Sequence, residues 1–276
     1  MCPPAHFEVA YEINPWMHNE VHPDPERAQA QWERLVAALR SAGAEVETMD
    51  PVPGLPDLVF TANAGLVDGD RFIPSRFRHP ERRGETDHDV AWFSRRGYRV
   101  AWLPEAVLHE GAGDALPFGG HGPNPPTLLS GYRFRSDAAS HAEVSRITGA
   151  PVRPLELADP RLYHLDLVFC PLDDRRAMVA PLGLDRYGLK VVESLVPELL
   201  YLEDEEALGF CANSVVVGDR IVMPGCPARV GDRLRSWGFE VEVCPVDEFL
   251  KAGGGCRCLT LALDVRLGVE ARGGPA

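Results

Sequence analysis

Amphipathic helices alternate with short apolar stretches along this chain. The first helix is the clearest, because Asp24 is a candidate N-cap and Pro25 occupies the first helical position. Comparable patterns predict helices near 89–96, 138–148, 184–196 and 227–237. The residues that recur at helical spacing on the first helix, and so predict its buried face, are Trp32, Leu35, Val36 and Leu39.

Most of these helices share a stop signal. A glycine can adopt the left-handed conformation past a helix end, and the valine found three residues later favours the start of a strand. The fourth helix lacks this glycine and ends at Pro197 instead. Apolar runs predict strands at 46–49, 58–60 and 259–263. The four glycines are Gly43, Gly97, Gly149 and Gly238.

A polar signal repeats in phase with these helices. Asn63, Asp114, Asp166, Asn213 and Cys258 follow one another at intervals of 51, 52, 47 and 45 residues. The Gly-x-x-Val pattern is common by itself. Each of the four glycines, however, precedes a polar marker by 17 to 20 residues, and this similar offset favours a true repeat. A repeat of about 50 residues is typical of a propeller or a solenoid. We predict an α/β fold in which five ββαβ-like units close into a five-bladed propeller with pseudo-fivefold symmetry. The strand ends would converge on a central axis and bring distant residues into one pocket.

Length and composition agree with one domain. The chain has 276 residues, of which 45% are apolar, enough for a sizeable core. We predict a single catalytic domain over 1–270 and a disordered tail at 271–276. The Pro/Gly-rich run at 117–126 is predicted to be a surface loop.

The net charge and the cysteine content limit which binding partners, cellular compartment and metals the sequence predicts. A net charge of −13 without a Lys/Arg block argues against nucleic acid and anionic membranes but is compatible with a cationic small ligand. No stretch reaches the ~20 apolar residues of a membrane span, and residues 1–6 lack the features of a signal peptide. Seven scattered cysteines indicate reduced thiols and a cytoplasmic protein. Without a CxxC pair, a structural zinc site is not expected, nor any other metal.

Several markers carry residue types that hydrolases use. Cys258 follows a Gly-rich turn, where nearby backbone N–H groups can lower the pKa of a thiol; a buried inert cysteine is the alternative. His164 and Asp166 would lie on one side of a strand, and an imidazole can protonate a leaving amine. A lone histidine is more often a core or surface residue, but this pairing favours a functional one. Glu110 could orient His164, whereas Cys256 is a bystander or a redox partner.

Together these motifs resemble the guanidino-group modifying enzymes: arginine deiminases, dimethylarginine hydrolases and amidinotransferases. The shared order is Asn/Asp after an apolar strand, Glu-Gly-x-Gly-Asp, His-x-Asp, and Gly-Gly-Gly-x-x-Cys near the end. The resemblance covers the whole chain and implies the five-bladed, pentein-type α/β propeller. It also implies that a cysteine attacks the guanidinium carbon and that water releases a covalent thiouronium intermediate.

The resemblance assigns roles position by position. It implies that Cys258 is the nucleophile, His164 the acid/base and Glu110 its partner carboxylate. Asp166 would bind the guanidinium, and Arg135 would grip the substrate α-carboxylate through fork-like donors. Three further positions complete the predicted substrate site: Arg82, which would assist Arg135, Asn14 and Phe60.

One departure from the pattern suggests the reaction. Deiminases and dimethylarginine hydrolases carry an aspartate where this chain has Asn63, and an amide can hold a neutral ureido group as readily as a charged one. The run from Met1 resembles cyanobacterial arginine dihydrolases, in which asparagines at the places of Asn14 and Asn63 mark a two-step reaction. The alternative for Asn14 is a turn residue before Pro15.

The resulting hypothesis is an arginine dihydrolase that yields ornithine, CO2 and ammonia. The alternatives are a dimethylarginine dimethylaminohydrolase or a deiminase giving citrulline, then an amidinotransferase, then a binding propeller without catalysis. No cofactor is expected. The predicted partner is a small molecule, arginine or a substituted arginine, with neither nucleic acid nor membrane; a homo-oligomer stays open.

Overall fold

The computed structural model describes residues 1–120 and 126–268. Within these residues, the strands form four sheets of three strands each. In every sheet the first two strands pair antiparallel, and the third returns parallel to the second after a helix. The predicted tail at 271–276 lies outside the described residues, as do 121–125 of the predicted loop at 117–126. Residues 117 and 118 of that predicted loop belong to a strand instead.

The four units follow one another along the chain. The first comprises β1 (Gly65–Asp68), β2 (Arg71–Pro74), α2 (Glu85–Arg95) and β3 (Arg99–Val100). The second comprises β4 (Ala115–Phe118), β5 (Thr127–Tyr132), α3 (Ser140–Thr148) and β6 (Val152–Glu156). The third comprises β7 (Phe169–Pro171), β8 (Arg176–Val179), α4 (Arg186–Leu195) and β9 (Glu198–Tyr201). The fourth comprises β10 (Val215–Val217), β11 (Arg220–Met223), α6 (Ala228–Ser236) and β12 (Glu240–Val243), preceded by the short α5 (Asp204–Leu208).

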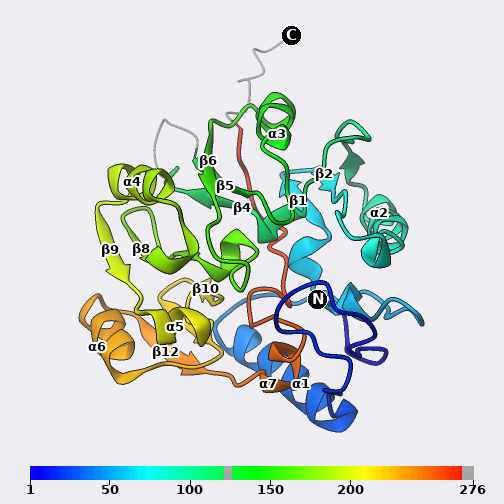
Figure 1. Cartoon of the computed structure of the whole chain (residues 1–276), viewed down its shortest axis with the longest axis horizontal. Coiled ribbons are helices and arrows are strands. Elements are labelled where there is room, and N and C mark those ends of the chain that lie inside the picture. The colour runs from blue at the N-terminus through cyan, green and yellow to red at the C-terminus, as the bar shows by residue number, and fades with distance from the viewer. Residues whose placement is uncertain (121–125, 269–276) are drawn as a thin grey trace.

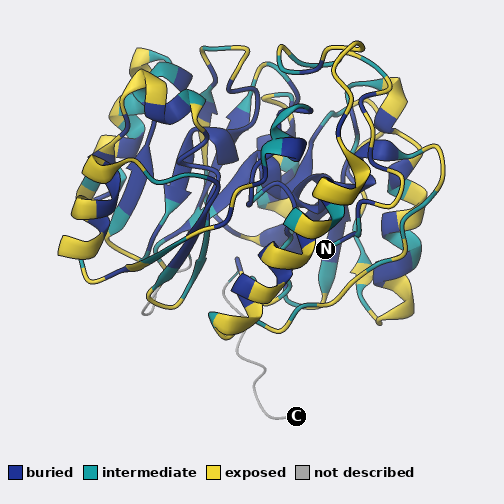
Figure 2. Ribbon diagram, turned by 90° about the horizontal axis from the view of Figure 1, so that it is seen from below, coloured by how far each residue is buried: buried dark blue, intermediate teal, exposed yellow. Residues whose placement is uncertain are grey.

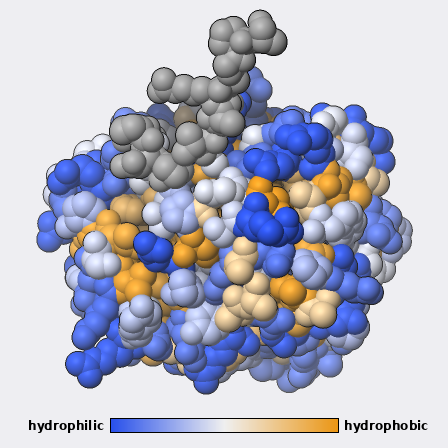
Figure 3. Space-filling model, turned by 90° about the horizontal axis from the view of Figure 1, so that it is seen from above, coloured by the Kyte–Doolittle hydropathy of each residue, from blue (hydrophilic) through white to orange (hydrophobic). Residues whose placement is uncertain are grey.

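The sheets surround a common centre. Figure 1 shows the helices on the outside and the last part of the chain, in red, passing through the middle. In Figure 2 the strands are mostly buried, whereas the outer faces of the helices are exposed. The outer surface in Figure 3 is mainly hydrophilic, with apolar side chains scattered between. The fold is therefore mixed α/β, with a buried interior toward which the strand ends point.

The first helix forms as its sequence predicts. In α1 (Pro25–Ser41) the Asp24 carboxylate accepts hydrogen bonds from the N–H groups of Glu26 and Arg27. Such a cap is worth about 1 kcal/mol. The four apolar residues that define its predicted face are all buried. Gly43, like the other three predicted stop glycines, has a positive φ, which a side chain would strain.

The three predicted strands at 46–49, 58–60 and 259–263 are wrong, since none of them belongs to a sheet. Pro56–Val59 is a 3₁₀ turn, in which the N–H of Phe60 donates to the carbonyl of Asp57 at 2.9 Å. Apolar content alone could not distinguish a buried turn from a buried strand, because both are hidden from water. No helix of the described residues is long and apolar enough to span a bilayer.

Candidate active site

Five of the nine predicted site residues lie on, or immediately before, short turns that precede a first strand. The 3₁₀ turns Thr61–Asn63, Gly111–Gly113 and Leu165–Leu167 lead into β1, β4 and β7. The prediction that His164 and Asp166 share one face of a strand is therefore wrong. His164 is extended and caps the third turn, whereas Asp166 lies inside it. The turns nevertheless bring residues from separate units to the centre of the molecule.

Cys258 is held by two residues from other units. The Asn213 amide donates from Nδ2 to Sγ at 3.1 Å, and its Oδ1 accepts from the Cys258 N–H at 3.1 Å. The Cys258 thiol donates to Oδ2 of Asp166 at 3.4 Å. Asn213 also donates to the Asp166 carbonyl at 3.2 Å, so one amide contacts both the sulfur and the main chain of Asp166. Oδ1 of Asp166 is buried without a partner in the described structure.

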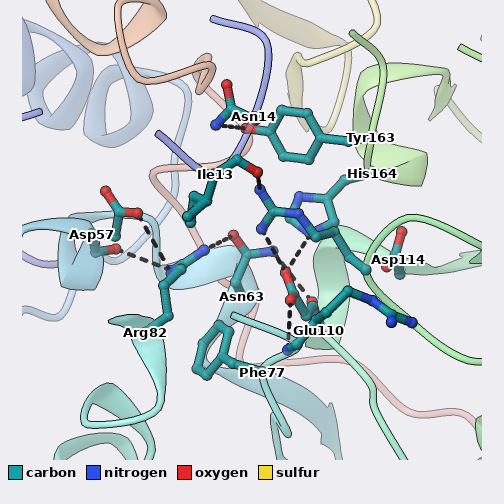
Figure 4. A network of polar contacts seen from close by, with 12 residues as sticks. Ile13, Asn14, Asp57, Asn63, Phe77, Arg82, Glu110, Asp114, Tyr163 and His164 are labelled. Carbon is teal, nitrogen blue, oxygen red and sulfur yellow. Dashed lines mark hydrogen bonds and ion pairs between the residues drawn. The ribbon is translucent and has the colours of Figure 1, made fainter. Parts of the chain in front are cut away.

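His164 and Glu110 meet directly. Nε2 of the imidazole lies 2.8 Å from Oε2 of Glu110. That oxygen also accepts from Nη1 of Arg135 at 3.1 Å, and the other accepts from the Arg78 N–H at 3.2 Å. Arg135 donates further to the Ile13 carbonyl at 3.0 Å (Figure 4). Arg135, which the sequence predicts to bind the substrate carboxylate, therefore already uses some of its N–H donors within the site.

Asn63 sits in a similar framework. Its Oδ1 accepts from Nη1 of Arg82 at 3.0 Å, and its Nδ2 donates to the Glu110 carbonyl at 3.2 Å. Arg82 is fixed from behind by both oxygens of Glu85, at 2.8 and 2.7 Å, and by the Asp57 carbonyl at 3.1 Å. The arginine and the carbonyl together define which way the Asn63 amide faces, as Figure 4 shows.

A small cavity opens among these groups. Asn14 reaches it from the N-terminal segment and donates from Nδ2 to the Ala252 carbonyl at 3.0 Å and to the Tyr163 hydroxyl at 3.4 Å. An added Cβ at Gly254 would clash with the Phe60 ring, so the glycine run lets the Cys258 loop approach. The side chains that line the cavity include Asn14, Phe60, Asn63, Arg82, Arg135, Tyr163 and Cys258. Glu110, His164 and Asp166 lie just behind, each bonded to another site residue.

Burial dominates the protonation states. It raises the pKa of the Cys258 thiol well above its ordinary value, and the neighbouring Asp166 raises it further. A backbone hydrogen bond at Gly255 lowers this pKa, as expected from the glycine-rich turn, but burial outweighs it. Burial also raises the pKa of Asp166 to about 7, although Arg257 opposes the shift.

The second pair behaves differently. Burial lowers the pKa of His164 to about 4 despite the neighbouring carboxylate. For Glu110, burial raises the pKa, but Arg135 and His164 outweigh it and the net shift is downward. The resting pair is thus a neutral imidazole that donates from Nε2 to an ionised carboxylate.

Some residues of the site were not singled out for it from the sequence. Asn213 marked a repeat but was given no role, although a buried asparagine in phase with the other markers was the available signal. Tyr163, Asp57 and Glu85 carried no such signal, because their contacts come from tertiary packing. All seven cysteines are free thiols, and Cys256 donates to the Cys244 carbonyl at 3.4 Å. Within the described ranges, no group of three or more His, Cys, Asp or Glu residues could hold a metal ion.

Comparison with known proteins identifies the family to which the chain belongs. The chain is 42% identical over 264 residues to the bifunctional arginine dihydrolase/ornithine cyclodeaminase ArgZ of Synechocystis, covering 95% of this chain and 37% of that protein. It is 39% identical over 263 residues to the N(G),N(G)-dimethylarginine dimethylaminohydrolase of Mycobacterium tuberculosis, covering 95% of this chain and 84% of that enzyme. No family model matches the chain.

Solved structures agree with these similarities. The N-terminal domain of an ArgZ mutant, an arginine dihydrolase bound to substrate, superposes with a TM-score of 0.91 at 41% identity, covering 95% of this chain and 96% of that one. A dimethylarginine dimethylaminohydrolase adduct superposes with a TM-score of 0.74 at 21% identity over 89% and 94% of the two chains, which shows the fold alone. This chain belongs to the guanidino-group modifying enzymes, the family of arginine dihydrolases and dimethylarginine dimethylaminohydrolases. It spans little more than a third of the length of the bifunctional relatives.

Proposed function

We propose that this chain is an arginine dihydrolase that converts L-arginine and two waters into ornithine, CO2 and two ammonia. The observation that carries the proposal is Asn63, a neutral amide held by Arg82 and the Glu110 carbonyl in the cavity that contains Cys258. The similarity to ArgZ over 95% of this chain supports the same conclusion.

In the first step, Cys258 attacks the guanidinium carbon and displaces ammonia. The thiol is protonated in the resting site, so the substrate must itself promote ionisation. A guanidinium bound at the partnerless Oδ1 of Asp166 would place a positive charge near the sulfur and lower the pKa of the thiol. The solved structure of the ArgZ N-terminal domain covalently bound to a reaction intermediate, with a TM-score of 0.92, is consistent with nucleophilic catalysis.

His164 transfers the protons in this scheme. The imidazole accepts a proton as the thiolate forms, and Glu110 stabilises the resulting imidazolium through the 2.8 Å contact. The imidazolium then protonates the departing ammonia, after which the neutral ring activates the water that releases the enzyme. Glu110 is ionised throughout, as its lowered pKa requires.

The substrate α-carboxylate is assigned mainly to Arg135. A guanidinium has five N–H donors, of which Arg135 uses one on Glu110 and one on the Ile13 carbonyl. Arg82 already makes four hydrogen bonds, to Glu85, Asn63 and the Asp57 carbonyl, so it serves better to orient Asn63. Asn14 and Phe60 complete the walls of the proposed substrate site.

The second hydrolysis depends on holding a neutral intermediate. After one turnover the guanidinium has become a ureido group, which gains little from a carboxylate but can still exchange hydrogen bonds with an amide. Asn63 supplies that amide, so citrulline stays bound long enough for Cys258 to attack again. The second attack displaces the remaining ammonia and leaves an S-linked carbamoyl group on Cys258. The second water cleaves the C–S bond, and the resulting carbamate loses CO2 to give ornithine.

A dimethylarginine dimethylaminohydrolase is the second candidate. The enzyme from M. tuberculosis is 39% identical and is covered over 84% of its length. The side chains that line the cavity include the polar Asn14, Asn63 and Arg82, which suit a guanidine that keeps its N–H donors better than one that carries N-methyl groups. A cytoplasmic location and the single catalytic domain over 1–270 stay predictions.

Product analysis tests the proposal. Purified protein incubated with arginine should give ornithine and ammonia in a 1:2 ratio, and Cys258→Ser should give neither. Citrulline as the end product would instead make the enzyme a deiminase, and methylamine or dimethylamine released from methylated arginines would favour the second candidate.

We also infer that the two ends of the chain form a fifth unit that completes a propeller with pseudo-fivefold symmetry. Residues 259–263 follow the marker Cys258 as β1 follows Asn63. Residues 44–49 follow α1 and Gly43 as β3 follows α2 and Gly97. These two segments occupy the places of a first and a third strand.

A further inference from the structure

The residue before each central turn has the same place in all four units. It stands five residues ahead of the first strand, since β1, β4, β7 and β10 begin at 65, 115, 169 and 215. In the first, third and fourth units its carbonyl accepts from the N–H three residues later, at 3.0, 3.2 and 2.9 Å. The four residues are Phe60, Glu110, His164 and Phe210. The first three belong to the site, so this place in the repeat supplies the site, and Phe210 is its remaining member.

Phe210 has a backbone conformation that phenylalanine rarely adopts, with a φ of 61°. Its N–H donates to the Ala207 carbonyl at 3.0 Å. The next N–H, of Cys211, donates to the Glu206 carbonyl at 3.1 Å, and the two bonds end α5. Helices that end in this way usually have glycine at the left-handed position. Here Gly209 comes one residue earlier, with a φ of −80°. The chain therefore keeps a strained aromatic residue where glycine would be unstrained.

The ring of Phe210 is buried and supports Trp16. The two rings meet edge to face, with centroids 5.0 Å apart and planes at 82°. Nε1 of Trp16 donates to the Arg161 carbonyl at 2.8 Å. A Cβ added at Gly253 would lie 3.0 Å from Cδ1 of Trp16, so the indole also packs on the glycine run before Cys258. The indole is thus fixed by a hydrogen bond, by the glycine run and by the Phe210 ring.

Trp16 anchors the N-terminal segment at the cavity. Its N–H donates to Oδ1 of Asn14 at 2.9 Å, while Nδ2 of the same amide donates to the Ala252 carbonyl at 3.0 Å. Asn14 and Ile13 both line the cavity. The Ile13 carbonyl accepts from Arg135 at 3.0 Å. A movement of Trp16 would therefore displace the Asn14 amide and the carbonyl that holds Arg135 together.

We propose that Phe210 is a positioning residue for substrate binding and that its ring acts through Trp16. The ring fixes the indole, and the indole in turn fixes the Asn14 amide and the Ile13 carbonyl in the wall of the cavity. The strained backbone is kept because glycine, which suits it, has no ring to place against Trp16. The inference rests on the proposed function, since the substrate is the arginine assigned to this cavity.

The positioning role predicts a selective effect on binding. The groups held through Trp16 line the cavity around the unreactive part of the substrate, so their displacement should weaken the binding of substrate and transition state alike. Loss of one aromatic pair should raise KM for arginine about 2- to 10-fold. The turnover number kcat should stay within about twofold of wild type.

Single and double variants test the proposal. Phe210→Leu keeps an apolar side chain without the ring, and Trp16→Leu removes the other partner. Phe210→Gly, which suits the left-handed backbone, gives the same comparison if the leucine variant does not fold. We expect KM for arginine to rise in each of these variants. The double variant Phe210→Leu/Trp16→Leu should match Trp16→Leu alone, because Phe210 acts through Trp16.

Phe93→Leu is the matched control. Phe93 is buried on α2 and meets Tyr98 edge to face, with centroids 5.0 Å apart and planes at 86°, so its pair has nearly the geometry of the pair at Phe210. It contributes no group to the cavity wall among the described residues. KM for arginine should therefore stay within about twofold of wild type in this control, even where the protein is destabilised.

Hydrogen exchange gives a second measurement, which needs no turnover. The Trp16 N–H donates to Oδ1 of Asn14 at 2.9 Å, and the Met17 N–H donates to the Asn14 carbonyl at 3.2 Å. Both amides should exchange about 2- to 10-fold faster in Phe210→Leu than in wild type, followed by NMR. They should exchange at the wild-type rate in the Phe93→Leu control.

Three results would overturn the proposal. One is an unchanged KM, or unchanged exchange at 16 and 17, in Phe210→Leu, since either breaks the connection between the ring and the cavity. Another is additive effects in the double variant, which would mean that Phe210 acts by a different route. The last is an equal rise of KM in Phe93→Leu, which would make the effect one of stability alone. A wild-type protein that does not consume arginine would refute the proposed function, whereas the exchange rates still test this inference.

Discussion

Replacement of Asn63 by aspartate should convert the two-step reaction into a one-step reaction. The side chain keeps its shape, and Nη1 of Arg82 still has an oxygen to bind. The other end of the side chain changes from a donor to an acceptor that faces the Glu110 carbonyl, where Nδ2 now donates at 3.2 Å. The variant therefore loses one buried hydrogen bond and gains a negative charge in the cavity.

The charge sets the size of the effect. Opposite unit charges about 5 Å apart attract by about 3 kcal/mol at an effective dielectric constant of 20. A guanidinium gains this attraction and a neutral ureido group does not. Because Arg82 offsets part of it, we expect the preference for arginine over citrulline in kcat/KM to rise about 100-fold. The product should shift from ornithine to citrulline.

The assay measures both steps separately. Arginine and citrulline are supplied as alternative substrates to wild type, Asn63→Asp and Asn63→Ser, and products are quantified by amino-acid analysis with ammonia release. The serine variant removes the amide without adding charge, so its preference should stay within about tenfold of wild type. Should Asn63→Asp still release ornithine and ammonia at 1:2, the role given to this amide would be wrong.

Three further changes address other parts of the structure. Asn213→Ala removes the donor to Sγ of Cys258 and should lower kcat/KM by about 10- to 100-fold, with slower thiol alkylation by iodoacetamide; an unchanged alkylation rate would contradict this. Because the pKa of Asp166 is raised to about 7 and its ionised form binds the cation, kcat/KM for arginine should fall about tenfold per pH unit below 7 in wild type, and Asp166→Asn should lack this limb. The pKa of Asp166 is about 4 in the unfolded chain and about 7 in the folded protein, so protonation of this group favours folding. The stability of wild type in urea, relative to Asp166→Asn, should therefore decline as the pH rises from 4 to 7. Asp24→Ala should cost about 1 kcal/mol of stability and lower Tm by about 2–4 °C while leaving activity unchanged.

The helices could be predicted from sequence because their signals are local. Asp24, Pro25 and the apolar face of α1 act within a few residues of one another, and the stop glycines do the same. The spacing of the polar markers also located Asn63, Asp166 and Cys258 correctly at the centre of the molecule. A repeat constrains position even when the conformation at each position is unknown.

The errors in the prediction arise where a property depends on how deeply a residue is buried and not on a periodic sequence pattern. The segment at 58–60 is apolar because it is buried, and a buried turn needs the same side chains as a buried strand. The pKa of Cys258 could not be predicted, since it depends on how deeply the thiol lies and on the distance to Asp166. Glu85 acts on the site only through Arg82, a contact that no local pattern reveals.

The three-residue turns before β1, β4 and β7 separate chemistry from architecture. Each turn, or the residue that precedes it, presents a polar side chain at the centre, whereas the adjoining strand and outer helix supply the packing that holds the unit together. A substitution on such a turn can alter what the protein recognises without disturbing the sheets behind it. A lineage of enzymes built in this way can acquire new reactions through a handful of inward-facing positions, while its framework diverges slowly and for unrelated reasons.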